Sequence, residues 1–389
     1  MIFRFADCNL DPDRQVLTRQ GKTVSVEPQV FALLQLLVEN PDRLVTRDEI
    51  VDTVWNGRVI SESAISARIA AARRAVGDDG KKQRVIRTVS RRGLRLAVPV
   101  EQNQASVGAH GTSVTKARYC TADDGASLAY VIGGQGPPVA GIVHNFTDIE
   151  REPYWPGLGE EWQAVMAQNT LLRYDPRGSG LSRQTVKSFD LDEWAEDLRA
   201  VLDAAGLEKV AIHAKTAGAL VALTFAARHP NRVSRMVLTG GYVDGRVRRS
   251  GAPHVADPIR GLLAEGWDDP NAVFVSAYMS AYFPDGPDHV VRNLAAYAQG
   301  NATREFIVRW RDVFDRASVA NLLPLIDCPV LVIHARHDRI HPLSEAQKLA
   351  AGISRSELLV LESGNHFPLY GDPGWDIYLS AMLNFLREP

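Results

Sequence analysis

The stretch HAKTAGAL, residues 213–220, lies between two apolar segments of different character. The segment before it ends in Val-Ala-Ile at 210–212, which is typical of a short buried strand. The run VALTFAARHP at 221–230 has the composition of a helix that ends before a proline. The sequence therefore predicts a strand that passes directly into a helix, with Thr216 on the tight turn between them.

Strands and helices alternate on both sides of this turn. Further strands are predicted within ASLAYVIGGQGPPVAGIVHNF (126–146), TLLRYD (170–175), SRMVLTGG (234–241), CPVLVIHARHD (328–338) and SELLVLESGNH (356–366), and helices within LDEWAEDLRAVLDAAGL (191–207) and YLSAMLNFL (378–386). Continuous apolar strands that alternate with helices favour an α/β fold. We expect a doubly wound, mostly parallel sheet that is covered by helices on both faces.

Short motifs in this part of the chain carry a resemblance to a known family. They are HNF (144–146), DPRGSGLS (175–182), AKTAG (214–218), HARHDRIHP (334–342) and SGNHFPL (363–369). Residues 118–389 resemble the α/β-hydrolase superfamily, and in particular hydrolase domains fused to bacterial transcription-regulator modules. The resemblance implies that Thr216 takes the nucleophile position, with Asp338 as the acid and His366 as the base. It also implies a helical cap over about residues 245–320.

Several departures from the family pattern bear on catalysis. Thr216 replaces the serine of G-x-S-x-G, Ala214 replaces its first glycine, and Asn145 replaces the glycine of the oxyanion segment. Lys215 adds a charge beside the hydroxyl. Such a turn forces its central residue toward positive φ, where a β-branched side chain is strained. We therefore expect weak hydrolysis or none.

The alternative is an active esterase or lactonase with a Thr-His-Asp relay. In such an enzyme His366 takes the proton of Thr216, and Asp338 orients the imidazole. It also needs two backbone N–H groups, from Phe146 and Ala217, aimed at one point.

We expect the hydrolase-like domain to bind a small molecule beneath the cap. We expect a mostly apolar pocket that suits a small aromatic or acyl compound, with no cofactor. The candidate ligand-binding residues, beside Thr216 and His366, are His144, Asn145, Phe146, Trp155, Lys215, Ala217, Tyr278 and Tyr282. Lys215 could pair with a ligand carboxylate, face solvent, or pair with an Asp or Glu side chain.

The histidines invite a metal hypothesis that their positions disfavour. His334, His337 and His341 have the spacing of a cluster, but they lie on a strand end and a loop, so their side chains are expected to diverge. No metal site is predicted. His213, on a buried strand, is expected to be a hydrogen-bonded core residue.

The first hundred residues follow a different pattern. One helical face is predicted from Val30, Leu33, Leu34 and Leu37, and another from Ile65, Ile69, Ala72 and Val76. Thr46 and Glu49 form a capping box, and Ser61 is a plausible N-cap. The segment RVIRTVSRRGLRLAVP (84–99) predicts a basic hairpin.

Three helices followed by a basic hairpin resemble the OmpR/PhoB-type winged-helix DNA-binding domain over nearly all of residues 1–98. The matching segments are NPDRLVTRDEIVDTVW (40–55), AISARIAAARRAVGDD (64–79) and VIRTVSRRGLRL (85–96). The resemblance implies DNA contacts from the third helix and the hairpin, by Ser63, Ser66, Arg68, Arg73, Arg74, Arg91, Arg92 and Arg95. The alternative is a winged helix that is used only for protein contact. In such regulators this domain usually follows a phosphoacceptor receiver; here we expect no receiver and an input signal from the rest of the chain.

Charge separates the two parts of the chain. Residues 1–100 hold 17 Lys and Arg against 12 Asp and Glu, whereas the remainder holds 27 against 34. Residues 68–95 alone hold ten basic side chains against two acidic ones. A basic end on an acidic body suggests that the smaller part meets a polyanion, although a solvated charged face is the common alternative.

Length and composition predict two domains in a cytoplasmic protein with no membrane span. We expect a winged-helix domain at 1–100, a flexible linker at 101–117 and a hydrolase-like domain at 118–389. The three cysteines are odd in number and far apart, which indicates reduced thiols.

Together these features favour a one-component transcriptional regulator that binds double-stranded DNA as a homodimer and senses a small molecule. Two hypotheses compete with it. One is the esterase or lactonase with an accessory DNA-binding domain, and the other is a scaffold whose hydrolase body only dimerises.

Overall fold

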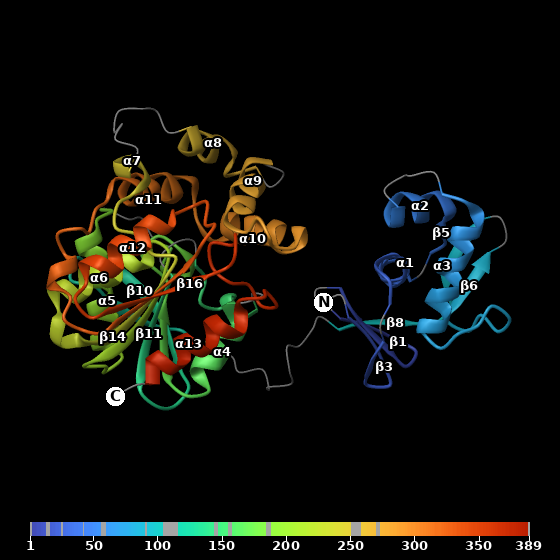
Figure 1. Ribbon diagram of the computed structural model, residues 1–389, viewed down its shortest axis with the longest axis horizontal. Coiled ribbons are helices and arrows are strands. Elements are labelled where there is room, and N and C mark those ends of the chain that lie inside the picture. The colour runs from blue at the N-terminus through green and yellow to red at the C-terminus, as the bar shows by residue number, and fades with distance from the viewer. Residues whose placement is uncertain are drawn as a thin grey trace. The chain divides into compact units, whose positions relative to one another are not determined.

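The computed structural model describes residues 2–12, 16–24, 26–41, 43–55, 60–89, 92–103, 116–143, 147–154, 158–183, 188–249, 258–269 and 273–387. The chain divides into two compact units, Met1–Ser113 and Val114–Pro389 (Figure 1). Each is described here by itself, as the N-terminal and the C-terminal unit. No described helix is long and apolar enough to cross a membrane.

The N-terminal unit combines two small sheets with three helices. The first sheet has the order β4-β3-β2-β1-β8 and is antiparallel; its strands are β1 (Ile2–Phe5), β2 (Cys8–Asp11), β3 (Val16–Arg19), β4 (Lys22–Val24) and β8 (Val100–Asn103). The helices are α1 (Pro28–Glu39), α2 (Arg47–Trp55) and α3 (Glu62–Ala75). The second sheet has the order β5-β7-β6, from β5 (Val45–Thr46), β6 (Ile86–Val89) and β7 (Gly93–Leu96). The predicted basic hairpin is β6–β7.

The sequence-based prediction missed the first sheet. Its strands have only three or four residues, although Phe3, Phe5, Cys8 and Leu10 alternate and are buried. The predicted linker at 101–117 is wrong at its start, because β8 extends to residue 103 and pairs with β1. Backbone hydrogen bonds define this edge strand, so its polar composition gave no signal.

The helix caps agree with the sequence. Thr46 N donates to Glu49 Oε2 at 2.7 Å and Glu49 N donates to Thr46 Oγ1 at 3.3 Å, which confirms the capping box. Ser61 caps α3 by accepting from the N–H of Ala64. The predicted face of α1 is buried, and α3 buries Ile65, Ala72 and Val76 while Ile69 is half-buried.

A single eight-stranded sheet organises the C-terminal unit. Its order is β16-β15-β14-β13-β11-β12-β10-β9. The strands are β9 (Arg118–Thr121), β10 (Ser127–Gly133), β11 (Pro138–Val143), β12 (Thr170–Tyr174), β13 (Val210–Lys215), β14 (Val233–Thr239), β15 (Val330–Ala335) and β16 (Ser356–Leu361). Only β10 pairs antiparallel, with β9 and β12, so the predicted mostly parallel sheet is confirmed.

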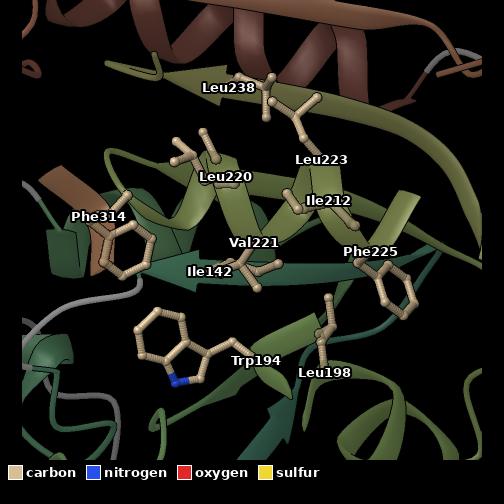
Figure 2. Close-up of a cluster of buried hydrophobic side chains, with 14 of the residues drawn as sticks. Ile142, Trp194, Leu198, Ile212, Leu220, Val221, Leu223, Phe225, Leu238 and Phe314 are labelled. Atoms are coloured by element: carbon tan, nitrogen blue, oxygen red, sulfur yellow. The ribbon is translucent and has the colours of Figure 1, made fainter. Parts of the chain in front are cut away.

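Helices cover both faces of this sheet (Figure 1). The helices α4 (Leu158–Met166) and α13 (Trp375–Arg387) share one core with it, and α5 (Leu191–Ala204), α6 (Gly218–Arg228) and α12 (Leu343–Gly352) share another. Figure 2 shows Leu220 and Val221 of α6 among Ile142, Ile212 and Leu238 of the strands. Burial of α6 on this scale holds the turn at Thr216 in place.

The described residues between β14 and β15, in the interval expected for a cap, form five helices. They are α7 (Arg246–Arg249), α8 (Pro258–Gly266), α9 (Val273–Tyr282), α10 (Asp288–Asn301) and α11 (Arg304–Arg316). Phe314 of α11 stacks on Trp194 of α5 at 4.9 Å between ring centroids, which anchors this segment to the core. Short 3₁₀ turns occur at Glu152–Tyr154, Gly180–Ser182, Pro230–Arg232 and Leu323–Leu325.

Candidate functional site

The side chains proposed to meet DNA differ in how the N-terminal unit holds them. Ser63, Ser66, Arg74, Arg92 and Arg95 are exposed on α3 and the hairpin. Arg91 lies outside the described residues.

Arg73 and Arg68 are instead tied into the fold. Arg73 is buried, and its guanidinium donates to Ile86 O at 3.0 Å and to Thr88 Oγ1 at 2.8 Å. Arg73, which the resemblance implied as a DNA contact, thus joins the helix to the hairpin. Arg68 is half-buried and pairs with Glu27 at 2.9 Å.

A carboxylate holds the loop between α3 and the hairpin. Asp78 accepts from the backbone N–H groups of Asp79, Arg84, Val85 and Ile86, each at 2.9 Å. Burial alone would raise the pKa of Asp78, but these hydrogen bonds outweigh it and lower the pKa. The loop thus fixes where the basic hairpin begins.

In the C-terminal unit the turn after β13 has the strained geometry that its sequence predicted. Thr216 is buried and has φ 50°, and its N–H donates to Thr239 O at 2.9 Å. Positive φ is a real outlier for a β-branched residue and costs about 1–3 kcal/mol. The packed strand and helix on either side sustain this strain.

The acid and the histidine of the implied relay are assembled. His366 Nδ1 lies 2.7 Å from Asp338 Oδ2, and both side chains are buried. Asp338 Oδ1 accepts from the N–H groups of Ile340 and His341, which fixes the carboxylate. Burial raises the pKa of Asp338, but the charge and hydrogen bond of His366 outweigh it, so the pKa lies below its usual value.

The nucleophile half of the relay is not joined to this pair. His366 Nε2 is buried and has no hydrogen-bond partner within the described part of the chain, and Thr216 makes no side-chain bond to it there. The ring of His366 packs on Gly240, where an added Cβ would lie 2.9 Å from its Cε1. Within the described residues the relay therefore lacks its bond between Thr216 and His366.

The other histidines support Asp338 and do not converge on a metal. His334 Nε2 lies 2.9 Å from His341 O and 3.3 Å from Asp338 Oδ2. His341 stacks on Tyr242 at 3.9 Å between ring centroids. Among the described residues no group of three or more His, Cys, Asp and Glu side chains is placed to hold a metal.

A small cavity of about 30 Å³ lies beside the turn, beneath the cap. It is lined by Val143, Thr147, Glu152, Leu158, Lys215, Met279, Tyr282, Phe283, Leu294, Tyr297 and Phe367. Of the predicted ligand-binding residues, Lys215 and Tyr282 line it. Those at His144, Asn145, Phe146 and Trp155 lie outside the described residues.

Other predicted residues lie outside that lining. Thr216, Ala217 and His366 are buried and are not part of it. Tyr278 lies one turn before Tyr282 on α9, and their hydroxyls are 2.8 Å apart. Its hydroxyl also accepts from Arg311 of α11 at 2.9 Å, so Tyr278 supports the wall from behind.

Comparison with known proteins identifies both units. Residues 154–373 match the family described as alpha/beta hydrolase fold. The chain belongs to this family. Residues 21–96 match the family described as transcriptional regulatory protein, C terminal, so the N-terminal unit of this α/β hydrolase is a regulator domain of OmpR/PhoB type.

The similar proteins are mostly named as hydrolases. Serine hydrolase BPHL of Mus musculus is 25% identical over 278 residues, which are 70% of this chain and 86% of that protein. Non-heme chloroperoxidase CPO-A1 of Kitasatospora aureofaciens is 28% identical, covering 64% of this chain and 91% of that protein. The solved structure of an esterase from a Rhodococcus species matches with a TM-score of 0.57 and 25% identity, over 69% of this chain and 98% of that one.

This α/β hydrolase carries a buried ion pair directly before its turn. Lys215 Nζ donates to Glu161 Oε2 at 2.6 Å, and the hydroxyl of Tyr378 donates to the same oxygen at 2.7 Å. Burial raises the pKa of Glu161, although Lys215 acts in the opposite direction. Of the three interpretations of Lys215, the Asp/Glu-paired one is confirmed and the solvent-facing one is wrong.

His213 completes this cluster as a neutral core residue. It is fully buried, and its Nε2 lies 3.4 Å from both Thr239 Oγ1 and Tyr378 Oη. Burial, followed by the charge of Lys215, lowers its pKa well below the usual value. The prediction of a hydrogen-bonded core histidine is confirmed.

Two acidic residues of the site had no motif to announce them. Glu161 lies on α4, and Glu152 pairs with Arg173 of β12 at 2.6 Å. Both carboxylates are buried, but each stands near other charged residues in the sequence, so no local pattern distinguished them. Their partners are 54 and 21 residues away, so the pairing depends on the fold.

Proposed function

We propose that this chain is a one-component transcriptional regulator whose winged helix binds double-stranded DNA. Its hydrolase-fold unit senses a small molecule with weak hydrolysis or none. The observation that carries this proposal is that no hydrogen bond joins Thr216 to His366 within the described residues. A threonine hydroxyl becomes a nucleophile only when a base removes its proton, and the buried His366 Nε2 lacks that bond within the described residues.

The cavity supports a sensing role. It lies between strand ends on one side and cap residues on the other, and its lining is mostly apolar. Met279 and Tyr282 on α9 and Leu294 and Tyr297 on α10 contribute to its wall. A ligand that displaces these side chains would change the arrangement of two helices. This gives binding a structural consequence.

Charge on the hairpin supports DNA as the partner. Arg87 on β6 and Arg95 on β7 are directly opposite in the register, and both are exposed. Like charges at opposite positions repel, and the phosphates of DNA would relieve that repulsion. The exposed Ser63 and Ser66 in the first turns of α3 suit contacts to base edges.

Coupling between the units follows from linkage. A ligand changes DNA affinity only if the two states of the protein hold it differently, and DNA must then change ligand affinity by the same factor. We propose that coupling acts through the pairing of two copies in a homodimer, because dimer geometry sets the spacing of DNA half-sites.

Ester turnover tests the central claim. With p-nitrophenyl acetate, the wild type should be indistinguishable from Thr216→Ala, since neither has a working nucleophile. DNA selected from a random pool should bind the full chain and lose affinity in Arg92→Ala. Brisk turnover that Thr216→Ala abolishes would overturn the sensor in favour of the enzyme.

The esterase or lactonase remains the second candidate. It is favoured by the intact pair of His366 and Asp338, since a lost enzyme has no catalytic need for a buried imidazole at 2.7 Å from a carboxylate. The similar proteins named as hydrolases support it as well. A rearrangement of the turn on substrate binding would have to bring Thr216 to His366.

A further inference from the structure

Two charged side chains line the cavity, and each forms an ion pair with an oppositely charged side chain that is not part of the lining. Lys215 Nζ binds Glu161 Oε2 at 2.6 Å, and Glu152 Oε2 binds Arg173 Nη1 at 2.6 Å. All four side chains are buried. The described part of the lining therefore presents two balanced pairs and no surplus charge.

This balance decides what the cavity can hold. A charged ligand would enter a buried site without a counter-charge, and the loss of its hydration would go uncompensated. An uncharged ligand meets no such penalty. Most of the remaining wall is apolar, from Val143, Leu158, Met279, Phe283, Leu294 and Phe367.

Lys215 has hydrogen-bonding capacity to spare. An ammonium group has three N–H donors, and within the described residues Lys215 has one oxygen acceptor, on Glu161. It otherwise faces the rings of Phe367 at 4.8 Å and Tyr378 at 5.6 Å. Because the ammonium group can only donate hydrogen bonds, the ligand atom beside it is expected to be a hydrogen-bond acceptor.

We propose that the cavity binds a small uncharged carbonyl compound, a ketone, lactone or ester, whose oxygen accepts a hydrogen bond from Lys215. This inference rests on the proposed sensor function and specifies the ligand class of the same site. The cavity of about 30 Å³ has room for only one or two water molecules. A ring compound therefore displaces the cap side of the wall when it binds, because the strand side is fixed by the sheet.

Binding of matched five-membered rings to the full chain tests the proposal. Isothermal titration with cyclopentanone, cyclopentanol, cyclopentane and cyclopentanecarboxylate should rank the ketone first. The carbonyl stretch of bound cyclopentanone should move to lower frequency, because the oxygen accepts from a cation. Tighter binding of the carboxylate or the alcohol overturns the proposal, and so does the absence of binding by all four.

A charge-balanced variant isolates Lys215 without leaving a buried charge. In Lys215→Met/Glu161→Gln, affinity for cyclopentanone should fall on the order of 10- to 100-fold while affinity for cyclopentane stays the same. The matched control is Arg173→Met/Glu152→Gln, which removes the other pair and should keep the preference for the ketone. Unchanged ketone affinity in the Lys215 variant overturns the proposal.

DNA binding separates this inference from the proposed function. If cyclopentanone binds through Lys215 but leaves DNA affinity unchanged, the ligand class stands and the coupling fails. If DNA affinity instead responds to a carboxylate that binds the cavity, the coupling stands and the ligand class fails.

Discussion

Among the buried pairs of a carboxylate and a basic side chain near the carboxyl end of the sheet, Asp338 with His366 and Glu161 with Lys215 are held in different ways. Asp338 accepts from two backbone N–H groups as well as from His366, and its pKa is lowered. Glu161 has only side-chain donors, from Lys215 and Tyr378, and burial raises its pKa. The first pair is stabilised by its loop, whereas the second depends on its two members.

The contrast distinguishes the two pairs by what holds each of them in place. The loop that holds Asp338 is part of the fold, so the pair persists whether or not Thr216 reacts. The pair of Lys215 and Glu161 instead leaves a buried charge if either member is removed. Variants that remove one partner at a time should separate these two roles.

The largest expected effect comes from breaking the second pair. Glu161→Ala leaves Lys215 as an uncompensated buried charge and should lower the free energy of unfolding by about 3–5 kcal/mol. Asp338→Asn should lower it by only about 1–2 kcal/mol, because a neutral His366 remains. Urea unfolding followed by tryptophan fluorescence measures both values.

The double variant Lys215→Met/Glu161→Gln serves as the control and should recover most of that loss. Equal losses in Glu161→Ala and Asp338→Asn would contradict the distinction between the two pairs.

Two neighbouring arginines of α3 show a similar contrast. Arg73 is buried and hydrogen-bonded, whereas Arg74 is exposed. Arg73→Ala removes the donors to Ile86 O and Thr88 Oγ1 and should destabilise the N-terminal unit by about 2 kcal/mol. Arg74→Ala should change stability by less than about 0.5 kcal/mol but reduce the salt dependence of DNA binding by about one phosphate contact. Thermal unfolding measures the stability changes, and DNA titration at several salt concentrations measures the salt dependence. A larger stability loss in Arg74→Ala than in Arg73→Ala would contradict both roles.

Removing one methyl group at the turn should test how far the nucleophile is from working. Thr216→Ser eases the positive φ and the crowding, and should raise p-nitrophenyl acetate turnover about tenfold, which corresponds to about 1.4 kcal/mol. His366→Ala in the serine variant is the control and should abolish the gain. Turnover of Thr216→Ser no higher than that of Thr216→Ala would mean that the relay is disrupted beyond the side chain.

The smallest expected effect is on how the free energy of unfolding varies with pH, where Asp338 and Glu161 should act in opposite directions. The folded pKa of Asp338 lies below 3.8, so its contribution to stability is present above that pH and is lost as the pH falls through the folded value. The folded pKa of Glu161 lies above 4.5, so its contribution is present below that pH and is lost as the pH rises through the folded value. Each slope stays below about 1.4 kcal/mol per pH unit.

The free energy of unfolding should be measured as a function of pH for the wild type, Asp338→Asn and Glu161→Gln. The pH dependence due to Asp338 should be absent in Asp338→Asn, and that due to Glu161 should be absent in Glu161→Gln. Slopes of the same sign for both carboxylates would refute the assignment of their environments.

Much of the architecture followed from the sequence alone because it depends on local periodicity. The continuous apolar strands predicted the parallel sheet, and the apolar helical faces predicted α1 and α3. The capping box at Thr46 and Glu49 gave the start of α2. The short strands of the first sheet escaped because three or four residues carry too little pattern, and β8 escaped because backbone pairing alone defines it.

The motifs determined which residues meet near the turn, since the order of strands brings Thr216, Asp338 and His366 to one end of the sheet. The tertiary structure decided what these groups do. Among the described residues it left His366 Nε2 without a hydrogen-bond partner, buried Arg73 against the hairpin, and placed Glu161 of α4 against Lys215 of β13. These outcomes depend on distances of a few tenths of an ångström and on partners tens of residues apart, to which the chemistry of hydrogen bonds and buried charges is sensitive and a sequence pattern is not.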